Sequence, residues 1–600
     1  FIDINTYMAR LVTTKFKIHN AEQFIESLSE TSATNLYLFI GKVQEWDDET
    51  NPPAPNEAVA NTLYSYWDQM IAAKKVTPAD VKHVIARINW ESNTSYTAYT
   101  HTNPDQLSNN FYVVTEDLNV YKCLQNNLSN GTSTIQPTGT GTAVIEIADG
   151  YKWKYMYTVT SQDTLKFVTA DYIPVQKSID ARQSAIEDAT VDGQIDIINK
   201  TANGYFNAEF TAGPINSAGD DQDFIIGEVL HGQTSNQYGS LISFVSAANS
   251  LIYDISAGNT KFTVGEIVLG ESSNSRATIS VEPASTYKFD TGFFASVTNS
   301  TVMQLSSGAN NTLNDLYVNS TIFIVNNAGQ GEQTTITQYD ALLQRITVSP
   351  AFSVTPNTVS GYEVTPSITL NGDGSLFKGR ARGTELLGVT EIVVTQSGLN
   401  YTVAEATIYA NSSHGAGANA TVIIGPIGGH GINAIEELGG NRILIDTRIS
   451  GNESGRFTTS NDYRQVGLLR DPLQTANTLA FFTDSLSDQS TTLFLGSVAG
   501  DFQPNEKVYT GSTLATSTAN GVVVDFLNTT TLRINEVKGS FEDSNVVTGA
   551  NTSSTGTISA DGVIQPEMKL YSGDVLYIEN RAKITRLQNQ VEDFKIVLEF

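Results

Sequence analysis

Apolar residues in the N-terminal part of the chain recur at the spacing of amphipathic helices. The pattern predicts an extended segment over residues 1–18, followed by helices over residues 20–28, 57–74 and 77–90. The third helix has the clearest start, because Thr77 suits the capping position, Pro78 the first helical position and Asp80 the first turn.

Three tryptophans lie in this region. Trp46 lies in an acidic, proline-rich loop, whereas Trp67 and Trp90 belong to the second and third predicted helices. Large rings at helix ends usually anchor a helix in the core. We therefore interpret Trp67 and Trp90 as core anchors, with stacking on a ligand as the alternative.

Elsewhere the apolar residues alternate or form short continuous runs, which is typical of strands. Strands are predicted over residues 35–41, 111–114, 120–124, 151–158, 442–446 and 462–469. In the fourth of these, Tyr151, Trp153, Tyr155 and Tyr157 share one face. We interpret this stripe as a sheet face that packs under another layer. Stacking on single-stranded nucleic acid is the alternative.

The glycine-rich stretch at residues 428–431 contains the best candidate for a chemically active side chain. His430 lies among the glycines, and Glu436 and Glu437 follow it. A metal site or a general base needs partners at ligand spacing, and neither H-E-x-x-H nor H-x-H occurs here. We interpret His430 as a turn residue that bonds within its own loop, and we predict no catalytic, cofactor or metal site.

Composition narrows the classes of function. The net charge of −28 argues against a broad surface for nucleic acid or for an anionic membrane. A single cysteine, Cys123, excludes an intrachain disulfide, and no run approaches the length of a membrane span. With no signal-peptide pattern at its start, the chain is predicted to be soluble and assembled in a reducing cytoplasm. Its 600 residues predict about three or four compact units.

A short motif recurs along the chain. F-x-x-G-E starts at Phe224 and again at Phe262, and looser copies start at Phe502 and Phe541. A Ser/Thr-rich turn and a strand follow each copy, so we interpret each as a small β-module used in tandem pairs and peripheral to the core. Acidic turns at residues 220–223 and 372–374 could bind calcium, but neither completes a known calcium motif, and we interpret them as solvated turns.

Six blocks of sequence, in order along the chain, carry a family resemblance. They are Lys15-Phe16, Gly41 with Trp46, and residues 76–90, 149–155, 463–472 and 573–581, the last running on to 593–600. These blocks resemble the smaller of the dimeric baseplate wedge subunits of T-even-like contractile-tailed bacteriophages. The resemblance covers about half of the chain. Residues 200–460 and 490–562 resemble no part of the short form and are interpreted as expansions.

The resemblance implies a mainly β fold with an α+β core: a layered β-sandwich with helix-bearing loops and inserted β-modules. The expected divisions are 1–200 (core, first part), 201–290 (module pair), 291–385 (inserted β region), 386–489 (β region returning to the core), 490–562 (second module pair) and 563–600 (strands completing the core).

The resemblance also implies a non-enzymatic, structural role in the virion. The expected partners are a second copy of the chain, other wedge subunits and tail fibre attachment proteins, with no nucleic acid and no membrane. A receptor-binding or glycan-degrading tail fibre or spike protein is the alternative. Structural or interaction contacts are expected from Trp46, Trp67, Trp90, Tyr151, Trp153, Tyr155, Tyr463, Arg464, Tyr577, Glu579, Asn580 and Arg581.

Overall fold

The structure is a computed structural model, and the residues that it describes lie between 12 and 600. The residues outside this description are 1–11, 57–59, 104, 127–130, 142–143, 178–194, 198–200, 204, 256–259, 282, 286–288, 312, 385–387, 397, 399, 410–415, 421 and 427–429.

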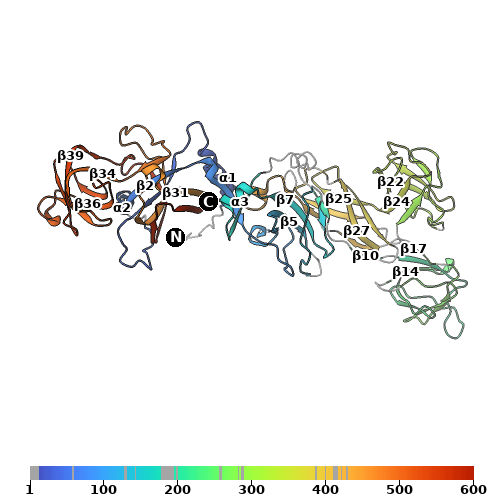
Figure 1. Ribbon diagram of the computed structural model, residues 1–600. Helices are drawn as coiled ribbons and strands as arrows, with labels where there is room; N and C mark the ends of the chain where they lie inside the picture. Colours follow the sequence, from blue (N-terminus) through green and yellow to red (C-terminus); the bar gives the residue numbers. More distant parts are fainter. Residues whose placement is uncertain are drawn as a thin grey trace, which may run out of the picture.

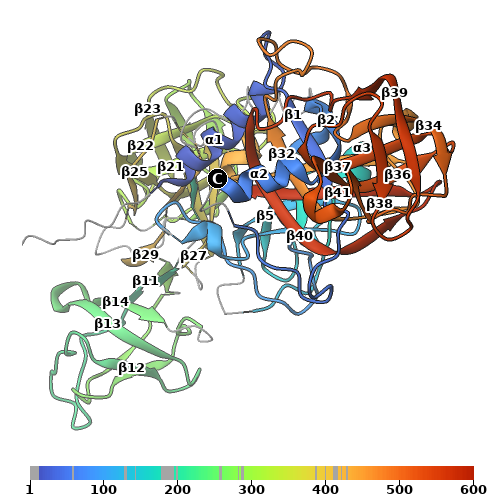
Figure 2. The ribbon, with the colours of Figure 1, turned by 90° about the vertical axis from the view of Figure 1, so that its left-hand side faces the viewer.

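The molecule is elongated and built mainly from strands, which confirms the predicted fold class (Figure 1). A closed β-barrel over residues 491–564 lies at one end, and the strands from both halves of the chain form the core beside it. Two β-rich units lie at the far end, and Figure 2 shows that one of them, containing β12 to β14, projects away from the rest.

The core is a sandwich of two antiparallel sheets, sheet A and sheet B. Sheet A has the order β33 (Leu486–Asp488), β2 (Met70–Val76), β1 (Leu36–Gly41), β32 (Asn461–Arg470), β40 (Asp574–Arg586). Sheet B has the order β41 (Val591–Glu599), β31 (Arg442–Ser450), β3 (Val81–Ala86), β8 (Tyr172–Pro174). The C-terminal strands β40 and β41 therefore extend the two sheets that contain β1 to β3.

Alternation along β1 explains its continuous apolar run. Leu38 and Ile40 lie in one cluster with Ile445 of sheet B. Phe39 points to the other face, where it lies in a cluster with Trp67 of α2 (Ala60–Asp68). Because both faces are covered, all six residues of β1 are buried.

The first helix starts earlier than predicted. Helix α1 spans Thr14–Ser27, and the Thr13 side chain caps it by accepting a hydrogen bond from the Phe16 amide at 3.3 Å. The predicted extended conformation is therefore wrong for residues 14–18, while residues 1–11 lie outside the described part. The buried positions Ile18 and Ala21 continue the apolar face of the predicted helix toward the N-terminus.

Two segments predicted as helices contain core strands instead. Only Ala60–Asp68 of the segment 57–74 is helical, and β2 follows it at once. Thr77 caps as predicted and forms a capping box with Asp80, but the box closes a single 3₁₀ turn before β3 instead of starting a helix. Pairing of β2 with β1 and of β3 with β31 overrides the local preference, and β-branched residues in β3 favour the strand.

The predicted hairpin strands near residue 120 are confirmed in a third sheet, sheet C. Its order is β4 (Tyr112–Val114), β5 (Asn119–Gln125), β7 (Lys152–Thr158), β6 (Ile145–Glu146). A bulge at Met156 makes Tyr155 pair with Tyr121 but Tyr157 pair with Val120. Tyr157 therefore faces away from the other three aromatic residues, and the prediction of one continuous stripe is wrong at this position.

The helix α3 (Ser161–Phe167) precedes β8; beyond β8 the chain leaves the core, and it returns through α5 (Ala434–Glu437). The described residues between them form a seven-stranded module-pair unit (205–285), a second seven-stranded unit (290–366) and short strand pairs. The module-pair order is β16 (Arg276–Thr278), β15 (Ile267–Gly270), β12 (Val229–Gly232), β13 (Tyr238–Val245), β14 (Ser250–Ile255), β11 (Tyr205–Glu209), β17 (Ala284–Ser285). The second order is β18 (Asp290–Phe293), β24 (Gly361–Pro366), β21 (Ser320–Ile324), β22 (Gln333–Asp340), β23 (Arg345–Ser349), β20 (Val302–Gln304), β19 (Ser296–Val297).

The strand pairs are β9 (Ile195–Ile197) with β30 (Val422–Ile424), β10 (Thr201–Asn203) with β29 (Ala416–Asn419), β25 (Ile368–Gly372) with β28 (Ala404–Ile408), and β26 (Lys378–Thr384) with β27 (Gly388–Gln396). The barrel closes in the order β34 (Thr491–Ala499), β37 (Thr531–Gly539), β36 (Ala519–Leu527), β35 (Lys507–Thr510), β38 (Val546–Gly549), β39 (Thr555–Ile564). It contacts the sandwich through Val524, which is buried in the cluster between the two sheets.

The two motif glutamates of the module-pair unit cross over to each other's module. Glu228 accepts hydrogen bonds from the Ser273 amide at 2.9 Å and from the Ser273 hydroxyl at 2.8 Å. Glu266 in turn accepts from the amide of Ser235 at 3.0 Å and from its hydroxyl at 2.8 Å. Each carboxylate thus fixes the turn that follows the partner module's strand, so the two modules fold as one unit.

The barrel retains half of this arrangement. Glu506 accepts from the Thr552 amide at 3.2 Å, as its counterparts do in the first pair. The second glutamate position is occupied by Asn545, whose side chain reaches only the Glu542 amide of its own module, at 3.2 Å. The strand residue opposite it is Thr510, where the other three modules have Gly232, Gly270 and Gly549.

Candidate interaction surface

The loop after β1 forms a strap across β40; we use the name strap for residues 43–56. Trp46 Nε1 donates a hydrogen bond to the Arg581 carbonyl at 3.0 Å, and Asn580 Nδ2 donates to the Pro53 carbonyl at 2.9 Å. The Glu49 carboxylate also accepts a hydrogen bond from the Lys583 amide. The strap therefore satisfies backbone groups of β40 at Arg581 and Lys583, where β40 is not paired with β32.

Arg464 of β32 fixes the strap from below. Its guanidinium is 1% exposed, and it donates from Nε to Glu49 Oε1 at 2.6 Å and from Nη1 to the Val43 carbonyl at 2.5 Å. Burial raises the pKa of Glu49, but the hydrogen bonds from Arg464 and from the Trp46 amide outweigh it and hold this pKa below its usual value. A planar, multiply bonded guanidinium suits this anchoring role.

Tyr577 and Glu579 continue this surface along β40. The Tyr577 hydroxyl donates to Glu579 Oε2 at 3.0 Å, and Arg581 Nε lies 3.6 Å from Glu579 Oε1. Burial, together with the Glu579 charge, raises the pKa of Tyr577 to about 12. These residues are half-exposed, so the strand carries both signs of charge at its surface.

Tyr463 and Trp67 lie in the core instead. Tyr463 is 1% exposed and packs against Phe594, with ring centroids 6.2 Å apart. Trp67 is buried under α2 beside Phe39 and Met70, the core-anchor position predicted for it.

The remaining four predicted residues gather on sheet C. Tyr151 and Trp153 are fully buried and stacked, with ring centroids 5.6 Å apart, and Tyr155 and Trp90 pack beside them. The Trp90 ring also donates to the Ser133 hydroxyl at 3.1 Å. The structure thus brings Trp46, Arg464, Tyr577, Glu579, Asn580 and Arg581 together at β40, with Tyr463 beneath them, and places the sheet C residues in a separate core.

His430 is not an isolated turn residue, and the interpretation of it as bonding only within its own loop is wrong. It is 1% exposed, and its Nδ1 lies 3.0 Å from Lys122 Nζ of β5. Because an ammonium group only donates, this contact makes Nδ1 the acceptor. Lys122 also donates to Glu437 at 2.9 Å and lies 3.7 Å above the Tyr99 ring.

This buried cluster joins sheet C to the segment that returns to the core. Glu437 Oε1 accepts a hydrogen bond from the Gly431 amide at 2.8 Å. Burial raises the pKa of Glu437, but the Lys122 ammonium outweighs it and holds this pKa well below its usual value. No group of three or more His, Cys, Asp or Glu among the described residues is arranged to hold a metal. The arrangement therefore supports a structural ion pair.

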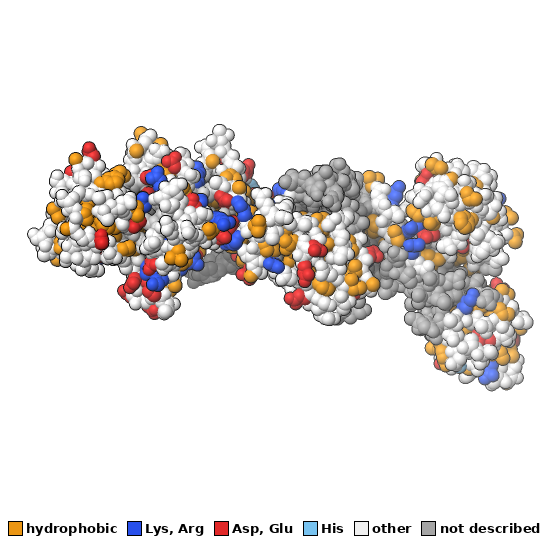
Figure 3. All heavy atoms as spheres, viewed as in Figure 1, with side chains coloured by type: hydrophobic (Ala, Val, Ile, Leu, Met, Phe, Trp, Pro, Cys, Tyr) orange, Lys and Arg blue, Asp and Glu red, His pale blue; other side chains and the backbone are white. Residues whose placement is uncertain are grey.

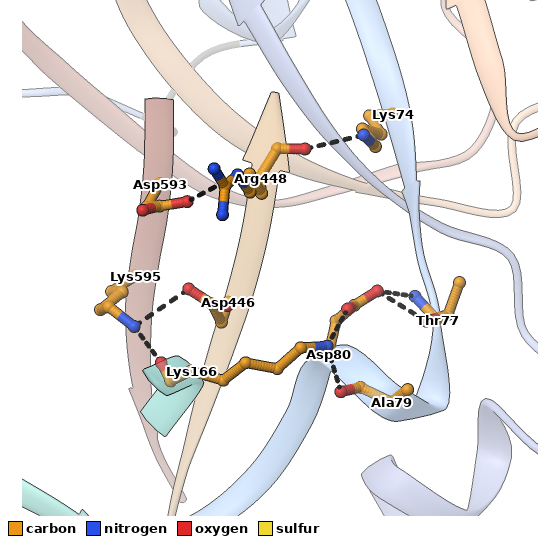
Figure 4. Close-up of polar contacts among 9 residues, drawn as sticks. All are labelled: Lys74, Thr77, Ala79, Asp80, Lys166, Asp446, Arg448, Asp593 and Lys595. Atoms are coloured by element: carbon orange, nitrogen blue, oxygen red, sulfur yellow. Dashed lines mark hydrogen bonds and ion pairs between the residues drawn. The ribbon is translucent and has the colours of Figure 1, made fainter. Parts of the chain in front are cut away.

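A second polar network ties strand β41 to its neighbour β31 and to the helix α3 (Figure 4). Lys595 of β41 contacts Asp446 of β31 at 3.1 Å and donates to the carbonyl of Lys166 in α3. The Lys166 side chain lies 3.0 Å from Asp80, which also closes the capping box with Thr77. Burial raises the pKa of Asp446, and the contact with Lys595 partly opposes this.

The space-filling view places these charges in context. In Figure 3, many of the Lys and Arg side chains on the visible face lie beside the barrel end, over the core sandwich, and are mixed with Asp and Glu. No helix in the described part of the chain is long and apolar enough to cross a membrane.

Sequence reasoning missed Glu49 and Lys122 as partners. The acidic loop around Trp46 offered three other carboxylates close by, so nothing local distinguished Glu49. Lys122 did give a signal in the sequence, because it interrupts an otherwise apolar strand, and the structure shows that this position is buried.

Comparison with known proteins supports the resemblance. The family model of Gp8 of bacteriophage T4 matches residues 116–199, which include β5, β7 and α3. The baseplate wedge protein gp8 of Enterobacteria phage T4 is 24% identical over 209 residues, which cover 29% of this chain and 62% of that relative. These matches confirm the predicted resemblance to a baseplate wedge subunit of T4-like phages. The aligned part stays below two thirds of the relative's length.

Proposed function

We propose that this chain is a structural component of a phage tail baseplate wedge. The similarity to the wedge protein gp8 carries the proposal. The described fold supports it, because blocks that carry the resemblance lie together although they are far apart in sequence. Trp46 contacts Arg581, and Gln465 donates a hydrogen bond to Asn580.

In this role the chain forms a homodimer and bridges neighbouring wedge subunits, with tail fibre attachment proteins as further partners. Its contacts take part in the rearrangement that triggers tail contraction and genome delivery. The role is non-enzymatic, and the subunit joins the virion after assembly in the bacterial cytoplasm. The elongated shape suits a bridging subunit, since it presents surfaces at both ends (Figure 1).

Localisation in the particle tests the proposal. Leu342 lies in a turn and is 87% exposed. An epitope tag inserted at this turn is therefore placed where an antibody can reach it on intact virions. Gold label at the baseplate is the expected result. Label at fibre tips would favour the receptor-binding or glycan-degrading alternative, and particles without label would contradict a virion role.

A further inference from the structure

The barrel is joined to the core sandwich by two short connections that lie side by side. Residues 489–490 lead from β33 into β34, and residues 565–567 lead out of β39. Strand β34 pairs with β39, so both connections leave the barrel at neighbouring strands. The connections also bond to each other, because the Asp488 amide donates to Glu567 at 3.0 Å and the Glu567 amide donates to the Asp488 carbonyl at 3.2 Å. Two adjacent connections define one axis about which the barrel can turn.

The barrel has an apolar core of its own. The buried cluster inside it consists of barrel residues alone. Among the described residues, Val524 is the one that the barrel adds to the apolar clusters of the sandwich. The register of β36 against β37 shifts between Val523 and Asp525, and this bulge turns Val524 outward while Val523 stays in the barrel core. A unit with a complete core can move without unfolding.

Polar side chains of β37 make further contacts with the sandwich. Arg533 donates to the Gly455 carbonyl at 2.9 Å, and its Nε lies 3.4 Å from Asp488. Asn535 donates to the Gln69 carbonyl at 3.2 Å. A polar interface of this kind between two units of one chain permits relative movement more readily than a continuous apolar core.

Part of this contact is incompletely paired. Side-chain oxygens of Gln489, Asn535 and Glu536 are buried without a hydrogen-bond partner among the residues that the structure describes. Burial raises the pKa of Glu536, and the charge of Lys42, a sandwich residue that is 8% exposed, is the largest effect that opposes this. Buried polar groups without partners cost free energy while the barrel is docked, so they reduce the free energy needed to separate it.

A cleft of about 490 Å³ lies beside the two connections. Val563, Ile564 and the connection 565–567 line it on one side, and the sandwich loop lines it on the other with residues 474–476, Phe482 and Asp484. Because this space is open, the barrel has room to turn at its axis.

We propose that the barrel is a hinged arm, which separates from the sandwich as an intact body. It turns on residues 488–491 and 564–567 and withdraws Val524 from between the sheets. A partner that binds the surfaces exposed in the open form shifts the equilibrium toward it. The movement is a property of the isolated chain, so it can be tested without the wedge role, and it gives the rearrangement of the proposed function a definite axis.

Thiol labelling of the native protein tests the hinge. Val524→Cys and Val523→Cys place cysteines at neighbouring positions that are both fully buried, the first in the sandwich and the second in the barrel. Cys123 is fully buried in sheet C and is common to both variants. Because local opening requires less free energy than global unfolding, we expect the thiol at position 524 to react at least about tenfold faster than the thiol at position 523. Equal rates at the two positions overturn the inference.

A second pair of variants on β37 covers a folding defect in Val524→Cys. Asn535 is 3% exposed and contacts the sandwich, whereas Ile534 is fully buried in the barrel core. Asn535→Cys should therefore react at least about tenfold faster than Ile534→Cys. Equal rates within this pair overturn the inference as well.

The polar contacts that hold the arm are tested in the same assay. Arg533→Gln removes the contacts with Gly455 and Asp488, and we expect it to raise the labelling rate at position 524 several-fold without changing the rate at position 523. Lys538→Gln removes an exposed positive charge from the same strand and should change neither rate. Labelling at position 524 that is insensitive to Arg533→Gln overturns the holding role of these contacts.

Discussion

Gly270 packs directly against the carboxylate of Glu228, and a β-carbon built on this glycine would lie 2.6 Å from both carboxylate oxygens. The same relationship recurs at Gly232 with Glu266, at 2.6 Å, and at Gly549 with Glu506, at 2.9 Å. A side chain at any of these glycines would collide with the glutamate of the other module, so the crossing glutamate requires glycine there.

Replacing Glu228 by Ala should destabilise the module-pair unit by about 3 kcal/mol, because buried amide and hydroxyl groups of Ser273 lose a charged acceptor. Thermal unfolding, with hydrogen exchange over residues 205–285, measures the effect. Glu271→Ala removes an exposed acid from the same turn and serves as the control, with a change within about 0.5 kcal/mol. Equal effects of both changes would contradict the capping role.

The barrel lacks the second glutamate–glycine contact, and two substitutions together should restore it. Thr510→Gly removes a buried hydroxyl that accepts a hydrogen bond from the Ala519 amide at 3.1 Å. Asn545→Glu adds a carboxylate for which there is no space while Thr510 is present, so each change alone should destabilise the barrel. Together they recreate the Gly and Glu pair, and we expect a favourable coupling of about 1 kcal/mol in a double-mutant cycle. Asn545→Gln in the Thr510→Gly background is the neutral control. Strict additivity would show that the position no longer accepts a crossing side chain.

The strap should depend on the fork geometry of Arg464. Arg464→Lys keeps the charge but cannot bond Glu49 and the Val43 carbonyl in the same way, and we expect a loss of about 2 kcal/mol with faster amide exchange over residues 43–56. Arg470→Lys on the same strand, where the pair with Asp574 is exposed, should change neither quantity measurably. Unaltered exchange in the Arg464 variant would show that the strap is held by other contacts.

Acid should weaken the link between sheet C and the returning segment. The folded pKa of Glu437 lies well below the ordinary value of 4.5, so its contribution is fully present above about pH 4.5 and is lost as the pH falls through the folded pKa. The contribution is roughly 3 kcal/mol. Unfolding measured from pH 6 to pH 2 should show this loss in wild type and a smaller one in Glu437→Gln. Glu436→Gln, at the exposed neighbouring position, should behave as wild type.

Excising the two module pairs should have different results, although both are interpreted from the sequence as peripheral. Strands β11 and β17 pair at Phe206 and Ser285, so a short Gly/Ser linker can replace residues 205–285 without moving the flanking chain. Removing residues 491–564 also removes Val524 from the sandwich cluster. We expect the first deletion to keep the core melting temperature within a few degrees and the second to lower it clearly. The reverse order would refute this assignment of contacts.

The sequence predicted those parts of the fold whose partners are local or whose pattern is unambiguous. The strands over 35–41, 442–446 and 462–469 and the hairpin of sheet C follow from alternation and from continuous apolar runs. The predicted helix over 77–90 failed, because β3 is defined by its neighbour β31, which lies over 350 residues away in the chain. No periodicity in a short segment records such a partner.

The candidate surface was predicted in the same uneven way. Trp46, Arg464 and Asn580 were chosen from blocks of a family resemblance, and the structure brings them to one strand. The residue that links them, Glu49, has no distinguishing pattern, because its role depends on a guanidinium that arrives from residue 464. His430 was likewise interpreted on its own, although its environment depends on Lys122, which the sequence analysis did not single out.

The long sequence separation between Lys122 and Glu437 also determines when this contact can form during synthesis. The two residues are 315 positions apart, so roughly 15–60 s of synthesis separate the appearance of the lysine from that of its carboxylate. Strand β1 waits still longer for β32, and β40 and β41 come last. The nascent chain must therefore keep its first strands unpaired on one side while the intervening β-units complete themselves, and the sandwich closes only as the C-terminus emerges.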